Sequence, residues 1–278
     1  MLRSFLSCLT VLLATLSVTG TAHAQVCDGD GGRCEIEGGH YHLSVPQDQA
    51  KGAVMFLHGY GGTGAGVVRN GGLVRAFTER GYAVIAPQGM PRRPGDRGGA
   101  WNSRNVPTGR DDVAFLARVA DDAATRLAIP RHEVVVTGFS GGGMMTWAVA
   151  CRTPDAFAAY GPIAGLLWRP LPEQCAGPVR FHHTHGWVDP VVPLEGRVLG
   201  GGRIVQGDLF KGLDMLRRSF GCVDDAPETY GTRDMYQTRT WSDCADGGSL
   251  TMALHPGGHA IPPGWANMLL DWYEAPES

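Results

Sequence analysis

Several features that would assign this chain to a class of binding protein are missing from its sequence. No stretch is rich in lysine and arginine, and the 24 basic and 27 acidic residues leave a formal net charge of -3. Proteins that bind nucleic acid usually carry a basic patch, so the charge indicates no such partner. Beyond the first 24 residues, no apolar run is long enough to cross a membrane. We therefore expect neither a nucleic-acid partner nor a membrane partner.

Internal repeats, low-complexity tracts and linkers are also absent. The 41 glycines and 18 prolines are spread along the chain as turns. Because 43% of the residues are hydrophobic and no linker divides them, we predict a single domain at 25–278. No C-x-x-C spacing occurs, which argues against a zinc site. We expect no metal and no cofactor.

The first 24 residues have the pattern of a secretory signal peptide. Arg3 supplies a positive charge, an apolar run follows, and AHA at 22–24 is a small-x-small cleavage site. We predict a signal peptide at 1–24 and a mature chain that begins near Gln25. The protein is then expected to be secreted or periplasmic, where disulfides persist.

Six cysteines follow the predicted signal peptide, and an even number favours disulfides in an exported chain. Their order along the chain favours pairing of neighbours, which would join Cys27 to Cys34, Cys151 to Cys175, and Cys222 to Cys244. Sequence alone leaves other pairings open. The segment CDGDGGRC also resembles the start of a calcium loop, but it lacks the later glutamate, so a disulfide-closed turn is favoured.

Strand-like and helix-like segments alternate along the rest of the chain. Apolar runs indicate strands at 41–46, 52–59, 82–89, 133–138, 179–186 and 250–257. Apolar spacing and end signals indicate helices at 110–127, 142–151, 207–221 and 263–274. This alternation predicts an α/β fold with a mostly parallel central sheet and helices on both faces. In such sheets, ligands bind beyond the carboxyl ends of the strands.

One serine stands in a glycine-rich bend between a predicted strand and the helix that follows it. The segment Gly138-Phe139-Ser140-Gly141-Gly142 fits the pattern G-x-S-x-G. With a strand before it and a helix after it, this pattern lifts the serine hydroxyl clear of the sheet. We interpret Ser140 as a nucleophile. The alternative is a glycine-rich turn whose serine only caps the helix.

A serine nucleophile needs a base to take its proton and an acid to orient that base. In sheets of this type the chain order is serine, acid, histidine. Asp189 follows one predicted strand, and His259 lies on a glycine-proline loop after the last strand. We therefore predict a triad of Ser140, Asp189 and His259. The alternatives are a turn aspartate before Pro190 and a solvated loop histidine, while His255 is a rival base that still belongs to the strand.

The segments LHGYGGTG, GRDDVAFL, GFSGGGMM, HGWVDPVVP and GGHAIPPGW carry a resemblance to a known family. They resemble the secreted esterase / poly(3-hydroxybutyrate) depolymerase family, which is similar to the feruloyl and acetylxylan esterases of carbohydrate esterase family 1. The resemblance covers nearly all of the predicted mature chain. It implies an α/β-hydrolase fold with Ser140 as nucleophile, His259 as base and Asp189 as its orienter. It also implies the disulfide between Cys222 and Cys244.

Acyl transfer places negative charge on a carbonyl oxygen, which backbone N–H groups can stabilise. Gly141 follows the serine at a helix N-terminus and is the first expected donor of this oxyanion hole. The second is expected from the HGYGGTG loop, at Tyr60 or next at Gly61, although a flexible surface loop is the alternative. The loop also matches G-x-G-x-x-G, with Glu79 as a ribose acid. We do not expect a dinucleotide site, because GAGVVRNGG is a poor helix start.

Two tryptophans, Trp101 and Trp187, lie on predicted loops at the functional edge and could offer flat faces to an aromatic or sugar ring. Simple packing is the alternative for both. Relatives often have a small residue in place of Trp187, so we expect its bulk to narrow the cleft. In FHHTHG, His183 and His185 share one face of a strand. We interpret them as a buried, hydrogen-bonded pair, with a zinc site as the alternative.

Together these features predict a serine carboxylesterase that acts through an acyl-enzyme on a small-molecule or oligomeric ester. Feruloyl, acetyl and hydroxybutyrate esters all stay open, and the lack of an appended binding domain favours soluble substrates. Two further classes stay open as well. They are a non-catalytic polysaccharide- or polymer-binding protein on a hydrolase scaffold, and a serine peptidase with the same triad.

Overall fold

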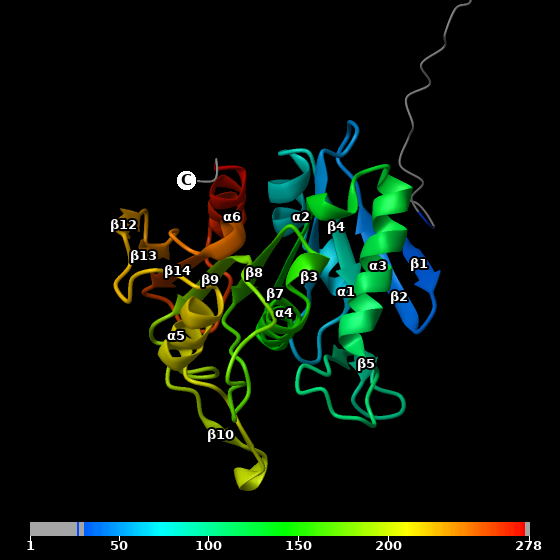
Figure 1. Ribbon diagram of the computed structural model, residues 1–278. Helices are drawn as coiled ribbons and strands as arrows, with labels where there is room; N and C mark the ends of the chain where they lie inside the picture. Colours follow the sequence, from blue (N-terminus) through cyan, green and yellow to red (C-terminus); the bar gives the residue numbers. More distant parts are fainter. Residues whose placement is uncertain (1–26, 28–30, 276–278) are drawn as a thin grey trace, which may run out of the picture.

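The computed structural model describes Cys27 and residues 31–275, so the predicted signal peptide at 1–24 lies outside the described residues. A ten-stranded sheet forms the centre of the fold (Figure 1). Its strands are β1 (Arg33–Ile36), β2 (Gly39–Ser44), β3 (Gly52–Leu57), β4 (Tyr82–Pro87), β7 (Val134–Phe139), β8 (Ala159–Ile163), β9 (Arg180–Gly186), β12 (Thr229–Arg233), β13 (Tyr236–Trp241) and β14 (Ser249–His255). Their order in the sheet is β1-β2-β4-β3-β7-β8-β9-β14-β13-β12.

The centre of the sheet is parallel and its edges are antiparallel. Strands β4, β3, β7, β8, β9 and β14 pair in parallel, while β1, β2, β12 and β13 add antiparallel pairings at the two edges. The predicted fold class is therefore confirmed. The apolar runs did not indicate β12, since four of its five residues are exposed. They also did not indicate β8, because AYGPI contains glycine and proline although it is fully buried.

Helices cover both faces of the sheet, as predicted. In the described part of the chain they are α1 (Gly64–Val68), α2 (Gly71–Thr78), α3 (Asp112–Leu127), α4 (Gly141–Arg152), α5 (Leu209–Ser219) and α6 (Trp265–Glu274), with short 3₁₀ turns η1 (Arg131–Glu133), η2 (Pro154–Ala156), η3 (Gly200–Gly202) and η4 (Ala245–Gly247). Strand side chains alternate between the faces. Ala53, Met55 and Leu57 of β3 join the core under α3, α4 and α5. Val54 and Phe56 join the core under α1, α2 and α6.

A short helix begins in the glycine-rich loop after β3. Thr63 caps α1, because its side chain accepts a hydrogen bond of 2.9 Å from the N–H of Gly66. The expectation that GAGVVRNGG is a poor helix start is therefore wrong. A hydroxyl cap and the buried side chain of Val67 support the turn despite its glycines. None of the helices in the described ranges combines the length and the apolar character of a membrane span.

Two small hairpins project from the carboxyl edge of the parallel strands, at the bottom of the view in Figure 1. The first pairs β5 (Met90–Pro91) with β6 (Gly99–Ala100) and follows β4. The second pairs β10 (Val198–Leu199) with β11 (Ile204–Val205) and follows β9. Both lie at the edge where ligands bind in parallel sheets, so they are placed to form walls around a site.

Three disulfides fix loops to this framework. They join Cys27 to Cys34, Cys151 to Cys175, and Cys222 to Cys244, the pairs that chain order favours. The first closes the CDGDGGRC segment, whose residues 28–30 lie outside the described residues. Disulfides of this number are typical of proteins that fold in an oxidising compartment.

Candidate active site

Ser140 occupies the sharp turn between β7 and α4. Its backbone has φ 56° and ψ -116°, a conformation that costs a non-glycine residue about 1–3 kcal/mol. The surroundings leave no room for side chains on the neighbouring glycines. A Cβ on Gly142 would overlap the carbonyl of Leu57, and one on Gly138 would overlap the backbone of Gly142. The side chain of Ser140 makes no capping bond to α4, which argues against the capping alternative.

The hydroxyl of Ser140 is hydrogen-bonded to a histidine from a distant loop. The Nε2 atom of His259 lies 2.9 Å from Ser140 Oγ, and its Nδ1 atom lies 2.7 Å from Asp189 Oδ2. An ionised carboxylate only accepts hydrogen bonds, so Nδ1 carries the ring proton and Nε2 is left to accept from the hydroxyl. The rival His255 is buried in β14, where its Nδ1 accepts from the N–H of Gly257.

Asp189 is buried, and its own loop supplies hydrogen-bond donors to it. Its Oδ1 atom accepts the N–H groups of Val191 at 2.8 Å and Val192 at 2.9 Å. Burial acts to raise the pKa of Asp189, but the bonds from His259 and from these two amides outweigh it and lower that pKa below its ordinary value. The carboxylate is therefore ionised at neutral pH. It contacts a second loop, which a simple turn aspartate before Pro190 would not do.

Two backbone amides lie side by side next to Ser140. A Cβ on Gly141 would stand 3.1 Å from the backbone N of Tyr60, and neither amide has an acceptor among the described residues. Gly141 begins α4, where N–H groups are unpaired and the helix dipole is positive. Gly61 is the other candidate donor from the sequence analysis. Its N–H is already donated to Gly99 O at 2.8 Å and is not available to a ligand. Tyr60 and Gly141 are thus the pair available to a carbonyl oxygen.

His58 holds the loop that carries the Tyr60 amide. Its Nε2 accepts the N–H of Gly89 at 3.0 Å, so Nδ1 carries the proton and donates to Gly59 O at 2.8 Å. Burial lowers the pKa of His58, which keeps the ring neutral. The indole of Trp101 donates to His58 O at 2.8 Å. These bonds fix the loop against the first hairpin, an arrangement unlike the open phosphate cradle of a dinucleotide site.

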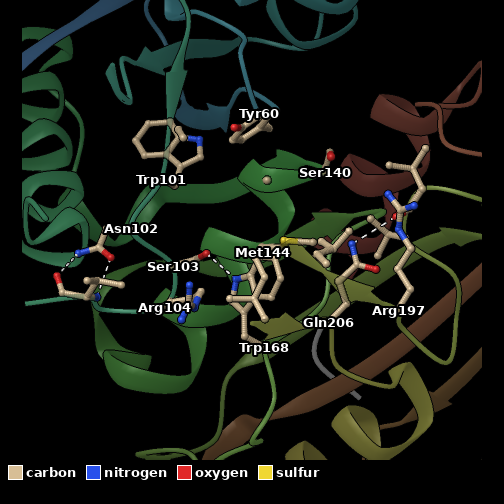
Figure 2. Close-up of a pocket in the computed structure, with 17 residues that line it drawn as sticks. Tyr60, Trp101, Asn102, Ser103, Arg104, Ser140, Met144, Trp168, Arg197 and Gln206 are labelled. Carbon is tan, nitrogen blue, oxygen red and sulfur yellow. Dashed lines mark hydrogen bonds between the residues drawn. The ribbon is translucent and has the colours of Figure 1, made fainter. Parts of the chain in front are cut away.

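A cavity of about 520 Å³ opens beside Ser140, and Figure 2 shows the residues around it. Trp101, Trp168 and Met144 give it a largely aromatic and apolar lining, and Leu199 and Ile204 of the second hairpin complete the wall. Tyr60, Ser140 and Gly141 also line it. The residues that carry the hydroxyl and the two free amides therefore border one space, which is large enough to hold the acyl or alcohol part of a ligand.

The two tryptophans singled out in the sequence have different positions. Trp101 lines the cavity. Trp187 does not line it; its side chain lies on the surface and is 43% exposed. Its place outside the cavity lining does not support the expectation that Trp187 contacts a ligand and narrows the cleft. Trp168 also lines the cavity, although no motif around it marks it.

The loop that carries Trp101 is fixed by a buried carboxylate. Asp112, the first residue of α3, accepts the N–H of Asn102 at 2.5 Å and pairs with Arg110 at 2.6 Å. Arg110 also donates to Gly38 O at 2.9 Å, which ties this wall to the neighbouring strands. The aromatic wall is therefore held rigidly with respect to the sheet.

His183 and His185 form the hydrogen-bonded pair that we predicted, with 3.0 Å between the Nε2 of the first and the Nδ1 of the second. Their other ring nitrogens are bonded to Trp147 and to Val192 O. All four ring nitrogens are thus occupied, which disfavours the zinc alternative. Within the described ranges, no group of three or more histidine, cysteine or acidic side chains could hold a metal ion.

Comparison with known proteins agrees with the fold described above. A family model described as the alpha/beta hydrolase fold matches residues 52–183. The acetyl xylan esterase from Aspergillus awamori superposes with a TM-score of 0.60 at 17% identity, over 84% of this chain and 93% of that one. At this level of identity the similarity shows the fold alone.

Two relatives are closer in sequence. The esterase NocK of Nocardia uniformis subsp. tsuyamanensis is 30% identical over 148 residues, which cover 51% of this chain but only 41% of NocK. Feruloyl esterase C of Emericella nidulans is 30% identical over 211 residues, which cover 68% of this chain and 72% of that protein. This last similarity extends over more than two thirds of both proteins, and the family model identifies the fold. The chain therefore belongs to the esterases of the α/β-hydrolase family.

Proposed function

We propose that the protein is a serine carboxylic ester hydrolase of the feruloyl and acetylxylan esterase type, with Ser140 as nucleophile, His259 as base and Asp189 as its orienter. The observation that carries the proposal is the hydrogen-bonded series from Ser140 through His259 to Asp189 at the wall of a ligand-sized cavity. A binding protein would have no need for a strained serine or for a fully hydrogen-bonded buried carboxylate behind it.

In the first half of the reaction, Ser140 Oγ attacks the ester carbonyl carbon while His259 Nε2 takes the hydroxyl proton. Asp189 keeps the ring in the correct tautomer and stabilises the imidazolium that forms. The negative charge on the carbonyl oxygen is met by the amides of Tyr60 and Gly141. One such donor contributes about 2.7–4 kcal/mol to the transition state.

The tetrahedral intermediate then collapses, and its bond to the alcohol oxygen breaks. His259 gives its proton to the departing alcohol, which leaves the acyl group on Ser140. A water molecule attacks this acyl-enzyme with His259 again as base, and the carboxylic acid departs as the serine regains its proton. These steps balance with the ester and water as the only reactants.

The cavity supports a preference for esters whose acyl group is aromatic. Its volume of about 520 Å³ lies within the range of small-molecule sites, and Trp101 and Trp168 offer flat faces to a ring. The named activity of the Emericella nidulans relative, a feruloyl esterase, points in the same direction. Acetyl groups on xylan and hydroxybutyrate oligomers are competing substrates of the same reaction class.

We further propose that the enzyme works outside the cytoplasm. The predicted signal peptide and the three disulfides support a secreted or periplasmic location. The proposed partner is the ester itself, as a soluble molecule or a short oligomer released from a polymer.

A substrate panel tests this function. The mature chain and its Ser140→Ala variant are assayed with methyl ferulate, acetylated xylan, hydroxybutyrate oligomers and casein. We expect the highest kcat/KM with methyl ferulate and no turnover by the variant. Preferred cleavage of casein would identify a peptidase instead. Failure of the folded protein to hydrolyse any ester would leave the binding-protein alternative.

A further inference from the structure

A buried series of hydrogen bonds lies behind the Asp189 loop and connects it to the nucleophile helix. The Nε1 atom of Trp147, in α4, lies 3.1 Å from His183 Nδ1, in β9. His183 Nε2 lies 3.0 Å from His185 Nδ1, and His185 Nε2 lies 2.7 Å from Val192 O. Trp147 and Val192 are 1% exposed and the two histidines 0%. The series is therefore sealed from water along its whole length.

The two ends of this series fix the position of every proton in it. The indole of Trp147 can only donate, so His183 Nδ1 must accept and the ring proton of His183 stands on Nε2. That proton is donated to His185 Nδ1, so the proton of His185 also stands on Nε2. It is donated in turn to the carbonyl of Val192, which can only accept. Only this arrangement of the ring protons, with one proton on Nε2 of each histidine, satisfies all three hydrogen bonds, and we call it the proton order.

Both histidine rings must be neutral for this order to exist. Burial lowers the pKa of His183 well below its ordinary value, and burial also lowers the pKa of His185. The ionisable groups around them are His182 on the same strand, and Asp189, His255 and His259 near the carboxyl edge. A positive charge on either ring would be poorly solvated at this depth, so the neutral state is the stable one.

The series ends on the turn that holds the Asp189 carboxylate. Val192 donates its N–H to Asp189 Oδ1 at 2.9 Å and accepts the His185 proton on its carbonyl. His185 Nε2 also lies 3.5 Å from Asp189 Oδ2, the oxygen that faces His259. With the opposite proton order, His185 would turn a lone pair toward both the carbonyl and the carboxylate, and would repel both.

We propose that Trp147, His183 and His185 are positioning residues that act through Asp189. Their fixed proton order holds the 189–192 turn, and so keeps the carboxylate aligned with His259. No proton moves along the series during the reaction, and none of the three touches the substrate. The inference rests on the proposed function, because that function makes Asp189 the orienter of the base.

The first test reads the proton positions directly and does not depend on activity. Long-range ¹H–¹⁵N spectra of the wild-type histidine rings at neutral pH report which nitrogen carries each proton. We expect His183 and His185 to be protonated on Nε2 alone, with ring protons that exchange slowly with water. A ring of either residue protonated on Nδ1, or a charged ring, would overturn the inference even if the enzyme hydrolyses esters.

The second test separates positioning from packing. His185→Leu keeps the bulk and removes the donor, while in His185→Gln a side-chain N–H can still reach Val192 O. Since a small misplacement of a catalytic group costs about a hundredfold, we expect His185→Leu to lower kcat by about that factor and to leave KM within about twofold. His185→Gln is expected to keep kcat within about tenfold of wild type. Equal kcat values in the two variants would contradict a role for the donated proton.

A matched control lies on the same strand. His182 is as buried as His185, but it projects from the opposite face of β9 and packs against the ring of Trp272. His182→Leu is expected to lower stability and to leave kcat unchanged. A fall in kcat as large as that of His185→Leu would show that any buried change on β9 disturbs the site.

A variant at the far end of the series covers the case in which His185→Leu does not fold. Trp147→Phe keeps an aromatic ring and removes the one group among the described residues that donates to His183 Nδ1. We expect the His183 ring to lose its fixed protonation site in the spectrum and kcat to fall by about tenfold. An unchanged spectrum together with an unchanged kcat would contradict the inference.

Discussion

At Ser140 the chain adopts a strained backbone conformation, and its neighbours show how the strain is maintained. Residues around the turn approach so closely that only glycine fits at Gly138 and Gly142. The strand and helix on either side are almost entirely buried, so relaxation of the turn would disturb their packing. The energy of packing the two elements therefore holds the hydroxyl where His259 can reach it.

Replacement of Gly142 tests this close packing. Gly142→Ala places a methyl group against the carbonyl of Leu57, and we expect a loss of about 3 kcal/mol in the free energy of unfolding together with loss of ester hydrolysis. Urea unfolding and a ferulate assay measure the two effects. Gly72→Ala in α2 is the control, since its Cβ would meet only ordinary contacts. Equal stability of the two variants would contradict the packing account.

The tryptophans of the site differ in their expected contribution to substrate preference. We predict that Trp168→Ala lowers kcat/KM for methyl ferulate by about tenfold, because one lost apolar contact in a pocket costs about 1–3 kcal/mol. Turnover of a small acetyl ester, which does not reach that wall, is expected to change little. Trp187→Ala is the control and is expected to alter neither value. Equal losses for both esters would argue that Trp168 only supports the fold.

The triad of Ser140, Asp189 and His259 could be proposed from the sequence, because each of these residues stands in a local pattern next to the end of a strand. Trp168 and the two positioning histidines could not be assigned in this way. The role of the histidines depends on contacts such as that between Trp147 and His183, which joins segments 36 residues apart in the chain, and Trp168 meets the cavity only in the folded protein. No local pattern encodes such a contact.

Among the elements, the second hairpin has no counterpart in the sequence-based prediction. Strands β10 and β11 are two residues each, and although all four residues are apolar, the runs are too short to be recognised as strands. The buried strands β3, β4, β7 and β9 were recognised because both of their faces are covered and their runs are continuous. So short a hairpin is specified by its turn and its neighbours, which are weak signals in a glycine-rich segment.

Excision of this hairpin tests its role as a cavity wall. Gln206 N donates to Arg197 O at 2.9 Å, so the two ends lie close enough for two glycines to replace 198–205. We expect the variant to fold with a melting temperature within a few degrees of wild type, because the hairpin lies outside the main sheet. KM for methyl ferulate is expected to rise, and acetyl ester hydrolysis to persist. Unchanged ferulate kinetics would exclude the hairpin from the substrate site.

At the scale of the whole molecule, the core contains several histidines that burial keeps neutral. Burial lowers the pKa of His182 to about 4 and lowers the pKa values of His183, His185 and His255. The unfolded chain binds protons at these residues below a pH of about 6.5, whereas the folded chain does not. The folded state therefore loses stability as the pH falls through this range.

We predict that the free energy of unfolding is constant above a pH of about 7 and falls between about 6.5 and 4. Each buried histidine contributes a slope of up to about 1.4 kcal/mol per pH unit. The lowered pKa of Asp189 affects stability in a separate pH range, because its stabilising effect is lost only as the pH falls below about 4. Urea unfolding at intervals from pH 8 to pH 4 measures the curve. A flat profile down to pH 4.5 would contradict the neutral core histidines.

Fold class is the property of the whole molecule that sequence predicted best, since alternating buried strands and helices allow few architectures. At the antiparallel edges β2 was recognised but β1, β12 and β13 were missed, because strands such as β12 obtain their stability from pairing with a neighbour rather than from burial. The cavity was missed for a related reason. It exists only where two hairpins from distant parts of the chain enclose the loop around Ser140.

The central claim is that Ser140 attacks the ester and carries the acyl group. A fluorophosphonate that reacts with activated serines, followed by mass spectrometry of the digested protein, tests it most directly. We predict a single modified peptide that contains Ser140, no modification in Ser140→Ala, and loss of ester hydrolysis in step with labelling. Modification of a different residue, or full ester turnover by Ser140→Ala, would contradict the account.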